Sequence, residues 1–361
     1  MSTTASQDIV DLVREYSTKF LLPAEAPRGI FDVVGRGEAL SKTGTFDYWE
    51  RLRRPRKGAV GVGGYTGAAA TVLVKSGLPF YVNAVFKMGT GVYRVTAIDA
   101  TGLILTITLI SGVSDTVAED AVISVVTNAN VEGGTGTANK RNPEIKRTNT
   151  TQIMFDVMSI TKSSAGSDQE VGGKEFAKQM ADKMAQFRND TRGMLWSDIY
   201  IEAATKGDLS VAAGIPYYVT ANGYNPASST LTDINLSEFV RYIYDEIGGA
   251  PKELWMNPVD RATISKTFDN SYFRRDADST RRGVVAETFM TTNGIEMSIN
   301  TDVNIPAGSV YALNAKDVAL RPYRSFNVEE VKTLSDSDEY KVVAELSVEV
   351  NPSAQMGKFT F

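Results

Sequence analysis

Hydrophobic residues recur at three- or four-residue steps through Gly172–Ser197, and this pattern predicts one long helix. Its apolar stripe is made of Phe176, Met180, Met184, Phe187 and Met194. Gly172 and Gly173 end the preceding segment, and no proline interrupts the run. At about 1.5 Å per residue such a helix is about 39 Å long. We therefore expect other elements to lie across it.

A second amphipathic pattern covers residues 5–20. Its apolar face contains Ile9, Leu12, Val13, Tyr16 and Phe20. The segment Leu22–Arg28, with two prolines, ends this predicted helix. An isolated helix cannot bury its apolar face alone, so we expect it to dock on the body of the protein or on another subunit.

Composition changes abruptly between Gly58 and Gly136, a span that holds 13 of the 30 glycines and few charges. Short runs rich in β-branched residues at 92–98, 103–110 and 121–127 alternate with turn signals. This spacing predicts a small antiparallel barrel or sandwich. The glycine-rich start, Gly58–Gly64, lacks the lysine and hydroxyl residue of a phosphate-binding loop. We interpret it as a flexible linker.

The remaining patterns predict alternating helices and strands. A helix begins at Asn235 or Ser237 and ends before Gly248, and a short helix follows Asn257-Pro258. A buried strand at Leu254–Met256 lies between these two helices. Further strands are expected at 150–160, 283–289, 295–300, 310–314, 318–322, 340–351 and 357–361. The chain is therefore predicted to be of the α+β class.

Two basic clusters flank the β-rich span. The first contains Arg51, Arg53, Arg54, Arg56 and Lys57, and the second contains Lys140, Arg141, Lys146 and Arg147. If the span lies at the tip of a two-stranded arm, these clusters form the paired stems of that arm. They are either solvated linkers or contacts with an acidic surface of a neighbouring subunit or with nucleic acid. The loop 273–282, with Arg274 and Arg275, is either solvated or an ion-pair patch between subunits.

Composition argues against most catalytic chemistry. The chain has no cysteine and no histidine, which excludes disulfides, thiolate metal sites and every Ser-His-Asp arrangement. The acidic string at 336–339 lacks the glycine and the terminal glutamate of a calcium loop. We expect no catalytic residue, metal site, cofactor or enzyme activity. No apolar run suits a membrane span and the first residues do not form a signal peptide, so we expect synthesis and assembly in a cytoplasm.

The order of these segments resembles the major capsid proteins of tailed bacteriophages, which have the Hong Kong 97-type fold. The similarity covers about residues 20–57 and 137–361. It is strongest in the strand that begins Asn149-Thr-Thr-Gln152, in Gly172-Gly173 before the long helix, and in two C-terminal stretches, Lys332–Ser337 and Val342–Leu346. The span 58–136 departs from the usual short hairpin of this fold, and we interpret it as an inserted β domain exposed on the outside of a shell.

The resemblance implies a division of the chain. It consists of an N-terminal arm (1–36), extended-loop strands (37–57 and 137–161), the insert (58–136), a peripheral domain with the spine helix (162–204), an axial domain (205–309) and return strands (310–361). It also implies that the chain is a head protein that assembles into hexamers and pentamers of an icosahedral shell. Its partners would be other copies of itself, with scaffold, portal and decoration proteins as further candidates.

A slightly acidic chain, with a net charge of −5, suits a shell that encloses DNA without binding its sequence. Charge reversal at Arg53 and Arg54 should then block assembly while the monomer still folds.

Two alternatives stay open. A phage tail or adhesion protein would bind carbohydrate through the insert, with Tyr65, Tyr81 or Tyr93 stacking on sugars. An enzyme would use carboxylates alone.

Overall fold

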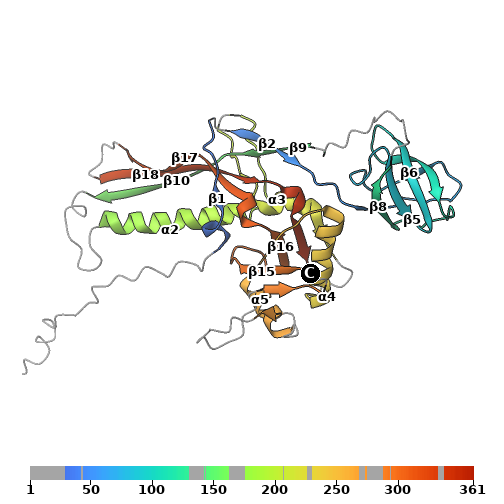
Figure 1. The fold of residues 1–361 in the computed structure, drawn as a ribbon. Coiled ribbons are helices and arrows are strands. Elements are labelled where there is room, and N and C mark those ends of the chain that lie inside the picture. The colour runs from blue at the N-terminus through green and yellow to red at the C-terminus, as the bar shows by residue number, and fades with distance from the viewer. Residues whose placement is uncertain are drawn as a thin grey trace, which may run out of the picture.

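The computed structural model describes residues 29–41, 44–129, 142, 144–161, 175–205, 207–225, 230–267, 273–274, 288–292, 294–331 and 337–361. The predicted helix at 5–20 lies outside these residues. Figure 1 shows an elongated molecule. Helix α2 (Glu175–Leu195) and its covering sheet extend to one side of the centre, and a β-barrel lies on the opposite side.

Helix α2 confirms the prediction made from its apolar stripe, and it packs under a four-stranded sheet. The order of this sheet is β1 (Gly35–Arg36), β17 (Val318–Val331), β18 (Ser337–Val350) and β10 (Gln152–Thr161). Phe187 and Met180 of the helix contact Met154 and Met158 of β10 and Val342 of β18. Strand β10 pairs with β18 on one side and forms the free edge of the sheet on the other.

A seven-stranded sheet forms the central body. Its order is β11 (Gly223–Tyr224), β19 (Gly357–Thr360), β16 (Ser309–Leu313), β12 (Glu253–Met256), β15 (Glu296–Thr301), β14 (Thr288–Met290) and β13 (Phe273–Arg274). The predicted helix after Asn235 is α4 (Asp233–Tyr242), which starts at the N-cap Thr232 and continues as the π-helical turn η3 (Ile243–Ile247). Gly248 ends it with φ 76°, a conformation that glycine adopts without strain.

Short helical segments complete the body. They are η1 (Ile30–Asp32), α3 (Ile215–Val219), η2 (Thr220–Asn222), α5 (Pro258–Thr267), η5 (Ala315–Asp317) and η6 (Ser353–Gln355). Two apolar clusters lie in the body. One joins Trp196 at the end of α2 to Trp255 and Tyr311 of the seven-stranded sheet, and the other places Phe239 of α4 against Phe359 of β19.

The predicted β insert is a closed six-stranded antiparallel barrel. Its order is β3 (Lys57–Ala59), β8 (Val122–Asn128), β5 (Ala84–Met88), β6 (Gly91–Ile98), β7 (Ile104–Ser111) and β4 (Thr71–Leu73). A bridge between Val60 and Val74 joins the two outer strands, and the Gly61 amide donates to the Leu73 carbonyl at 2.7 Å. The interpretation of Gly58–Gly64 as a flexible linker is therefore wrong, because this stretch closes the barrel.

A two-stranded ribbon lies between the body and the barrel. Strand β2 (Thr45–Arg51) pairs antiparallel with β9 (Glu144–Thr150). The expected pairing of the two basic clusters differs from this register. Arg51, Lys146 and Arg147 belong to the ribbon, whereas Lys57 begins β3 and pairs with Ser124 of the barrel. The ribbon therefore takes up the first residue of the first basic cluster and the last two residues of the second.

Candidate functional site

Ion pairs line the outer face of the ribbon. Arg51 lies opposite Glu144, and its Nε donates to Glu144 Oε1 at 3.0 Å. Lys146 Nζ lies 2.7 Å from Asp47 Oδ2, and Trp49 stands between these two pairs. The Lys146 ammonium, together with a hydrogen bond from Thr148, lowers the pKa of the Asp47 carboxyl below its usual value. Ion pairs between β2 and β9 therefore order the side chains on the outer face of the ribbon.

The inner face of the ribbon is fixed to the body by buried polar groups. The Glu50 carboxylate is fully buried, accepts a hydrogen bond from the Ser353 amide at 2.9 Å and lies 3.5 Å from Arg147 Nε. Tyr218 Oη donates to the Thr148 carbonyl at 2.7 Å. Burial raises the pKa of the Tyr218 hydroxyl well above its usual value. Both contacts hold the ribbon at one angle to the body.

Asn149 forms the junction where β9 passes into β10. Its side chain is fully buried, and its Nδ2 donates to the carbonyls of Ala213 at 2.9 Å and Val348 at 2.6 Å. Its Oδ1 accepts from the Ala213 amide at 2.9 Å. A buried amide with these partners is satisfied, so Asn149 joins three distant segments of the chain without an exposed role. This residue opens the stretch that carries the resemblance described above.

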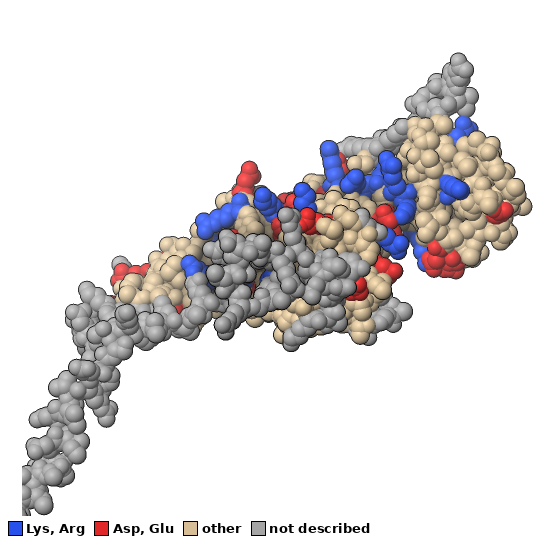
Figure 2. Space-filling view, turned by 60° about the horizontal axis from the view of Figure 1, so that its bottom comes forward, with Lys and Arg blue, Asp and Glu red and all other residues tan. Residues whose placement is uncertain are grey.

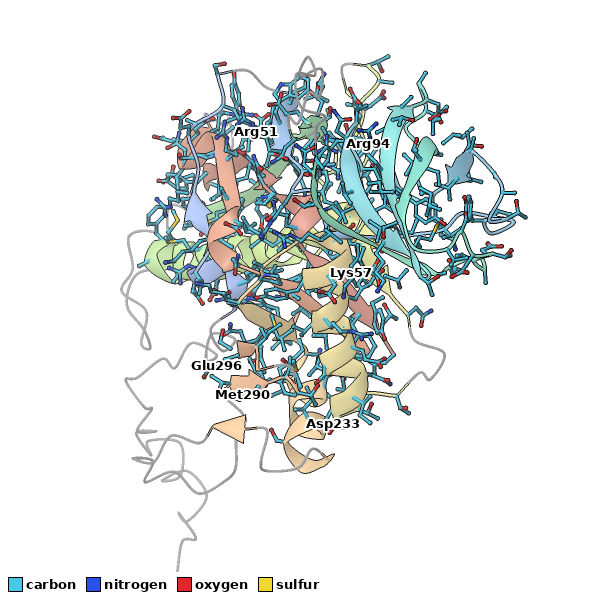
Figure 3. All side chains as sticks on the ribbon, turned by 45° about the vertical axis from the view of Figure 1, so that its right-hand side comes forward. Arg51, Lys57, Arg94, Asp233, Met290 and Glu296 are labelled. Carbon is cyan, nitrogen blue, oxygen red and sulfur yellow. The ribbon has the colours of Figure 1, made fainter. Side chains whose placement is uncertain are left out.

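Arg54 and Lys57 connect the barrel to the rest of the molecule. Arg54 Nη1 donates to the carbonyls of Leu78 at 3.0 Å and Phe80 at 2.8 Å, and its guanidinium lies 5.9 Å from the Tyr81 ring centroid. Lys57 forms an ion pair with Asp245 of η3. Figure 3 shows Lys57 between the barrel and the helix formed by α4 and η3. These two basic residues therefore have partners within their own chain.

Arg53 and Arg56 are exposed, and neither has an ion-pair partner among the residues that the structure describes. Figure 2 shows Lys and Arg side chains gathered where the barrel meets the body. Of the other predicted residues, Arg141 and Arg275 lie outside the described residues, and only the backbone of Arg274 is described, in β13. The structure thus gathers Arg51, Arg53, Arg56 and Lys146 as the accessible part of the predicted set.

The alternative of sugar stacking on the insert does not agree with the barrel. Tyr65 and Tyr93 are 3% and 1% exposed, and their rings contact each other inside the barrel core. Tyr81 is half-buried beside Arg54. Within the described ranges, no group of three or more acidic side chains is arranged to hold a metal ion. No helix in the described part of the chain is long and apolar enough to cross a membrane.

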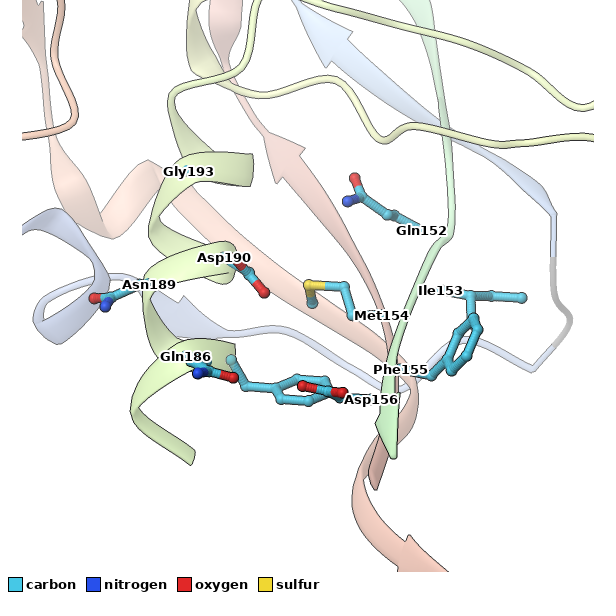
Figure 4. A pocket seen from close by; sticks show the side chains of 10 residues that line it. Gln152, Ile153, Met154, Phe155, Asp156, Gln186, Asn189, Asp190 and Gly193 are labelled. Atoms are coloured by element: carbon cyan, nitrogen blue, oxygen red, sulfur yellow. The ribbon is translucent and has the colours of Figure 1, made fainter. Parts of the chain in front are cut away.

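The most exposed apolar surface of the ribbon and the neighbouring sheet was not predicted. Trp49 is 63% exposed on β2, and Ile153, Phe155 and Val157 are 51%, 64% and 48% exposed on β10. Beside β10 a groove is lined by both β10 and α2, with Asp156, Gln186 and Asp190 on its walls. Figure 4 shows Ile153 and Phe155 on the side of β10 away from this helix, whereas Met154 points toward it. The alternation of apolar and mixed residues in 152–158 was the signal for this second apolar face.

Comparison with known proteins gives a consistent result. The profile of the SU10 major capsid protein family matches residues 11–361. A structure from Microbacterium phage Oxtober96 is 9% identical with a TM-score of 0.55, and the match covers 100% of this chain and 99% of that one. The capsid of a native GTA particle, computed with C5 symmetry, is 10% identical with a TM-score of 0.53, covering 100% and 99%.

A structure from Mycobacterium phage Bobi is 10% identical with a TM-score of 0.50, and the match covers 98% of this chain and 97% of that one. No curated protein matches the sequence. At these identities the likeness to solved structures concerns the fold, and it extends over nearly the whole chain.

Proposed function

This chain belongs to the SU10 major capsid protein family, and we propose that its copies form the hexamers and pentamers of an icosahedral shell around double-stranded DNA. It has the Hong Kong 97-type fold and is a major capsid protein of tailed phages, a structural component of the virion that assembles with itself. The family match over residues 11–361 is the observation that carries this conclusion.

The proposal assigns a role to each part of the chain. Residues 1–36 are the N-terminal arm, 37–57 and 137–161 the extended loop, and 58–136 the insert on the outside of the shell. Residues 162–204 are the peripheral domain and 205–309 the axial domain, and 310–361 return to the peripheral sheet. The physical support is that two apolar clusters fill the body while the barrel has its own core.

We further propose that the exposed basic residues contact a neighbouring subunit. Arg53 and Arg56 support this role because they are exposed and have no ion-pair partner among the described residues. Arg51 and Lys146 stand on the outer face of the ribbon beside them. Arg141, Arg274 and Arg275 are proposed for the same role from the sequence alone, whereas Arg54, Lys57 and Arg147 support it indirectly by orienting the barrel and the ribbon.

Other features of the proposal follow from a container role. The chain acts without catalysis, holds the genome without reading its sequence, and assembles in the host cytoplasm. Scaffold, portal and decoration proteins are its proposed partners beside other copies of itself. A wall with a net charge of −5 suits this role, because a surface that binds DNA along its length is usually basic.

Expression of the full chain alone, followed by size exclusion and negative-stain electron microscopy, tests the shell. We expect closed shells, or rings of five and six subunits. Co-expression with the other head proteins of the same genome supplies a scaffold in case assembly requires one. A protein that stays monomeric under both conditions contradicts the proposal.

The basic contact has its own test. The double variant Arg53→Glu and Arg56→Glu should reduce the assembled fraction at least about tenfold, since reversing two interfacial charges costs several kcal/mol. Lys87→Glu, at an exposed site on the barrel, is the matched control and should assemble normally. Sedimentation velocity measures the assembled fraction, and far-UV circular dichroism checks that each monomer folds. Normal shells from the double variant would exclude this contact.

A further inference from the structure

We propose that the ion pair between Lys57 and Asp245 is a reversible latch between the barrel and the body. When the pair is closed it holds the barrel in one orientation, and when it opens the barrel turns about the segment 52–56. The latch acts within a single chain, so it goes beyond the proposed function and does not depend on shell formation. Three observations carry it: a short connecting segment, a rigid seat for Asp245, and a pair that water reaches.

The segment 52–56 contains no helix or strand. Its first residue, Leu52, directly follows strand β2 of the ribbon and is buried. From Arg54 onward the chain is fixed to the barrel, because the guanidinium donates to two barrel carbonyls and the Arg56 carbonyl accepts from the Val125 amide at 2.8 Å. Hinges are usually a few such residues that absorb changes in φ and ψ. Rotation of the backbone between Leu52 and Arg54 can therefore turn the barrel and leave these hydrogen bonds intact.

Asp245 stands on a rigid part of the body. It belongs to η3, whose first residue, Ile243, is fully buried in the apolar cluster around Phe239. The Gly249 amide donates to the Ile243 carbonyl at 3.0 Å, and a side chain at Gly249 would lie 2.1 Å from the Gln355 carbonyl oxygen. The end of this helix is therefore packed closely on η6. Single π-helical turns are frequent at functional positions, and this one gives the Asp245 carboxylate a fixed place on the body.

Among the described residues, the contact between the barrel and the body is centred on β3 and η3. Lys57 begins β3, and its ammonium pairs with the Asp245 carboxylate. Close to this pair, a side chain at Gly248 would lie 3.5 Å from the Arg53 carbonyl oxygen. Figure 3 shows Lys57 at one end of the helix formed by α4 and η3, and Asp233 at the other end. The ion pair thus crosses the boundary beside the segment about which the barrel would turn.

The strength of this pair suits a latch that opens and closes. The side chains of Lys57 and Asp245 are 42% and 36% exposed, so both charges are partly hydrated. Exposed pairs of this kind change an equilibrium by about fivefold at most. Salt weakens them further, because the Debye length falls from about 10 Å at 0.1 M to about 3 Å at 1 M. A partly exposed pair therefore favours one orientation of the barrel without making it permanent.

An acidic surface of another copy can compete for Lys57. Arg53 and Arg56 lie on the same segment, are exposed, and have no ion-pair partner in the part of the chain that the structure describes. Carboxylates that bind these two residues would come close to Lys57 and compete with Asp245. This step rests on the proposed function, and it predicts that assembly opens the latch.

Distances between two spin labels measure the orientation of the barrel, and the absence of cysteine leaves only the introduced sites to be labelled. The labels are placed at Ile110→Cys on β7 and Val259→Cys on α5, where the natural side chains are 54% and 65% exposed. Excess unlabelled chain restricts the signal to distances within one chain, in free and assembled protein alike. At low salt we expect one main distance, which represents the closed latch.

Asp245→Asn should raise the population at other distances about two- to fivefold and make the distribution insensitive to salt. In the labelled chain that keeps Asp245, 1 M salt should produce the same increase. Asp233→Asn, at the other end of the same helix, is the matched control and should leave the distribution and its salt response unchanged. The charge exchange Lys57→Asp with Asp245→Lys should restore the main distance at low salt.

The outcomes separate the latch from the proposed function. If Asp245→Asn and the chain with Asp245 give the same distribution at every salt concentration, the latch proposal is wrong, whether that distribution is narrow or broad. Calorimetry of Asp245→Asn should show unchanged unfolding, so that a broader distribution reports orientation. A larger population at other distances in shells than in the free chain supports opening on assembly, and an unchanged one excludes it. Failure to form shells counts against the proposed function and leaves the result for the free chain standing.

Discussion

At the scale of single residues, the buried Glu50 carboxylate should matter more for stability than any exposed charge on the ribbon. Truncation to alanine leaves the Ser353 amide and Arg147 without their partner in a buried setting. We expect Glu50→Ala to lower the free energy of unfolding by about 3 kcal/mol. Urea unfolding followed by circular dichroism measures it. Glu144→Ala, which removes the exposed pair with Arg51, should change it by less than about 1 kcal/mol. If Glu50→Ala and Glu144→Ala lower the free energy of unfolding equally, this expectation is wrong.

The buried Tyr218 hydroxyl should make the free energy of unfolding depend on pH in the alkaline range. Burial raises the pKa of the Tyr48 and Tyr218 hydroxyls above their usual value of 10.0. A raised folded-state pKa stabilises the fold fully below pH 10.0, and this contribution is lost as the pH rises toward the folded-state value. Between about pH 10 and 11.5 the free energy of unfolding should therefore fall more steeply for the natural chain than for Tyr218→Phe. Urea titrations at several pH values test this, with Tyr217→Phe as control. Parallel curves would refute it.

Residue roles on the ribbon were largely beyond reach of the sequence. The segment Thr45–Arg51 places Phe46, Tyr48 and Glu50 on one face and charged residues with Trp49 on the other. Both faces mix polar and aromatic residues, so no hydrophobic alternation marks the strand. The register of β2 with β9 decides which charged residues of the ribbon form pairs. The contacts of Ser353 and Tyr218, which are far away in sequence, decide which face of the ribbon is buried. The basic clusters were visible, but their partners were not.

At the scale of elements, helix α2 shows what hydrophobic periodicity predicts correctly and what it leaves open. The predicted stripe marks the correct helix, yet within that stripe Phe187 and Met194 are buried, whereas Phe176 and Met184 are exposed by about two-fifths. Phe187→Ala should lower the free energy of unfolding by about 3 to 4 kcal/mol because it opens a cavity against Met154 and Phe326. Met184→Ala on the same helix should change it by about 0.5 kcal/mol at most. Thermal and urea unfolding compare the two.

The barrel contains a segment, Gly58–Gly64, whose structure the local sequence pattern did not predict. Strands β6, β7 and β8 were predicted because they are rich in β-branched residues and are separated by turns, whereas β5 was not predicted. Gly58–Gly64 was interpreted as a linker because it lacks the residues of a phosphate-binding loop, but a side chain at Gly61 would lie 2.7 Å from Leu73 Cγ. Glycine is therefore required where two strands approach closely to close the barrel. Closure joins Val60 to Val74 through an isolated antiparallel bridge, a contact that periodicity within either strand does not encode.

At the scale of the whole molecule, the barrel and the body should behave as two units that fold separately. The barrel buries its own cluster around Phe86, Tyr93 and Leu105, and its first and last strands are neighbours, so its ends lie side by side. Contact with the body includes the Lys57–Asp245 ion pair, a link that adds little stability when partly exposed. A fragment covering residues 56–129 should therefore unfold cooperatively alone.

Replacement of residues 57–128 by a short Gly-Ser linker is the reciprocal experiment. Body residues such as Trp196, Trp255 and Tyr311 keep all their packing partners in this deletion, so the urea midpoint of the body should change little. Differential scanning calorimetry of the full chain should resolve two transitions that match those of the two pieces. A single transition in the full chain, with neither piece folding alone, would mean that the barrel and the body form one cooperative unit. Asp245→Ala would then be expected to lower that single transition, whereas for independent units it should leave both unchanged.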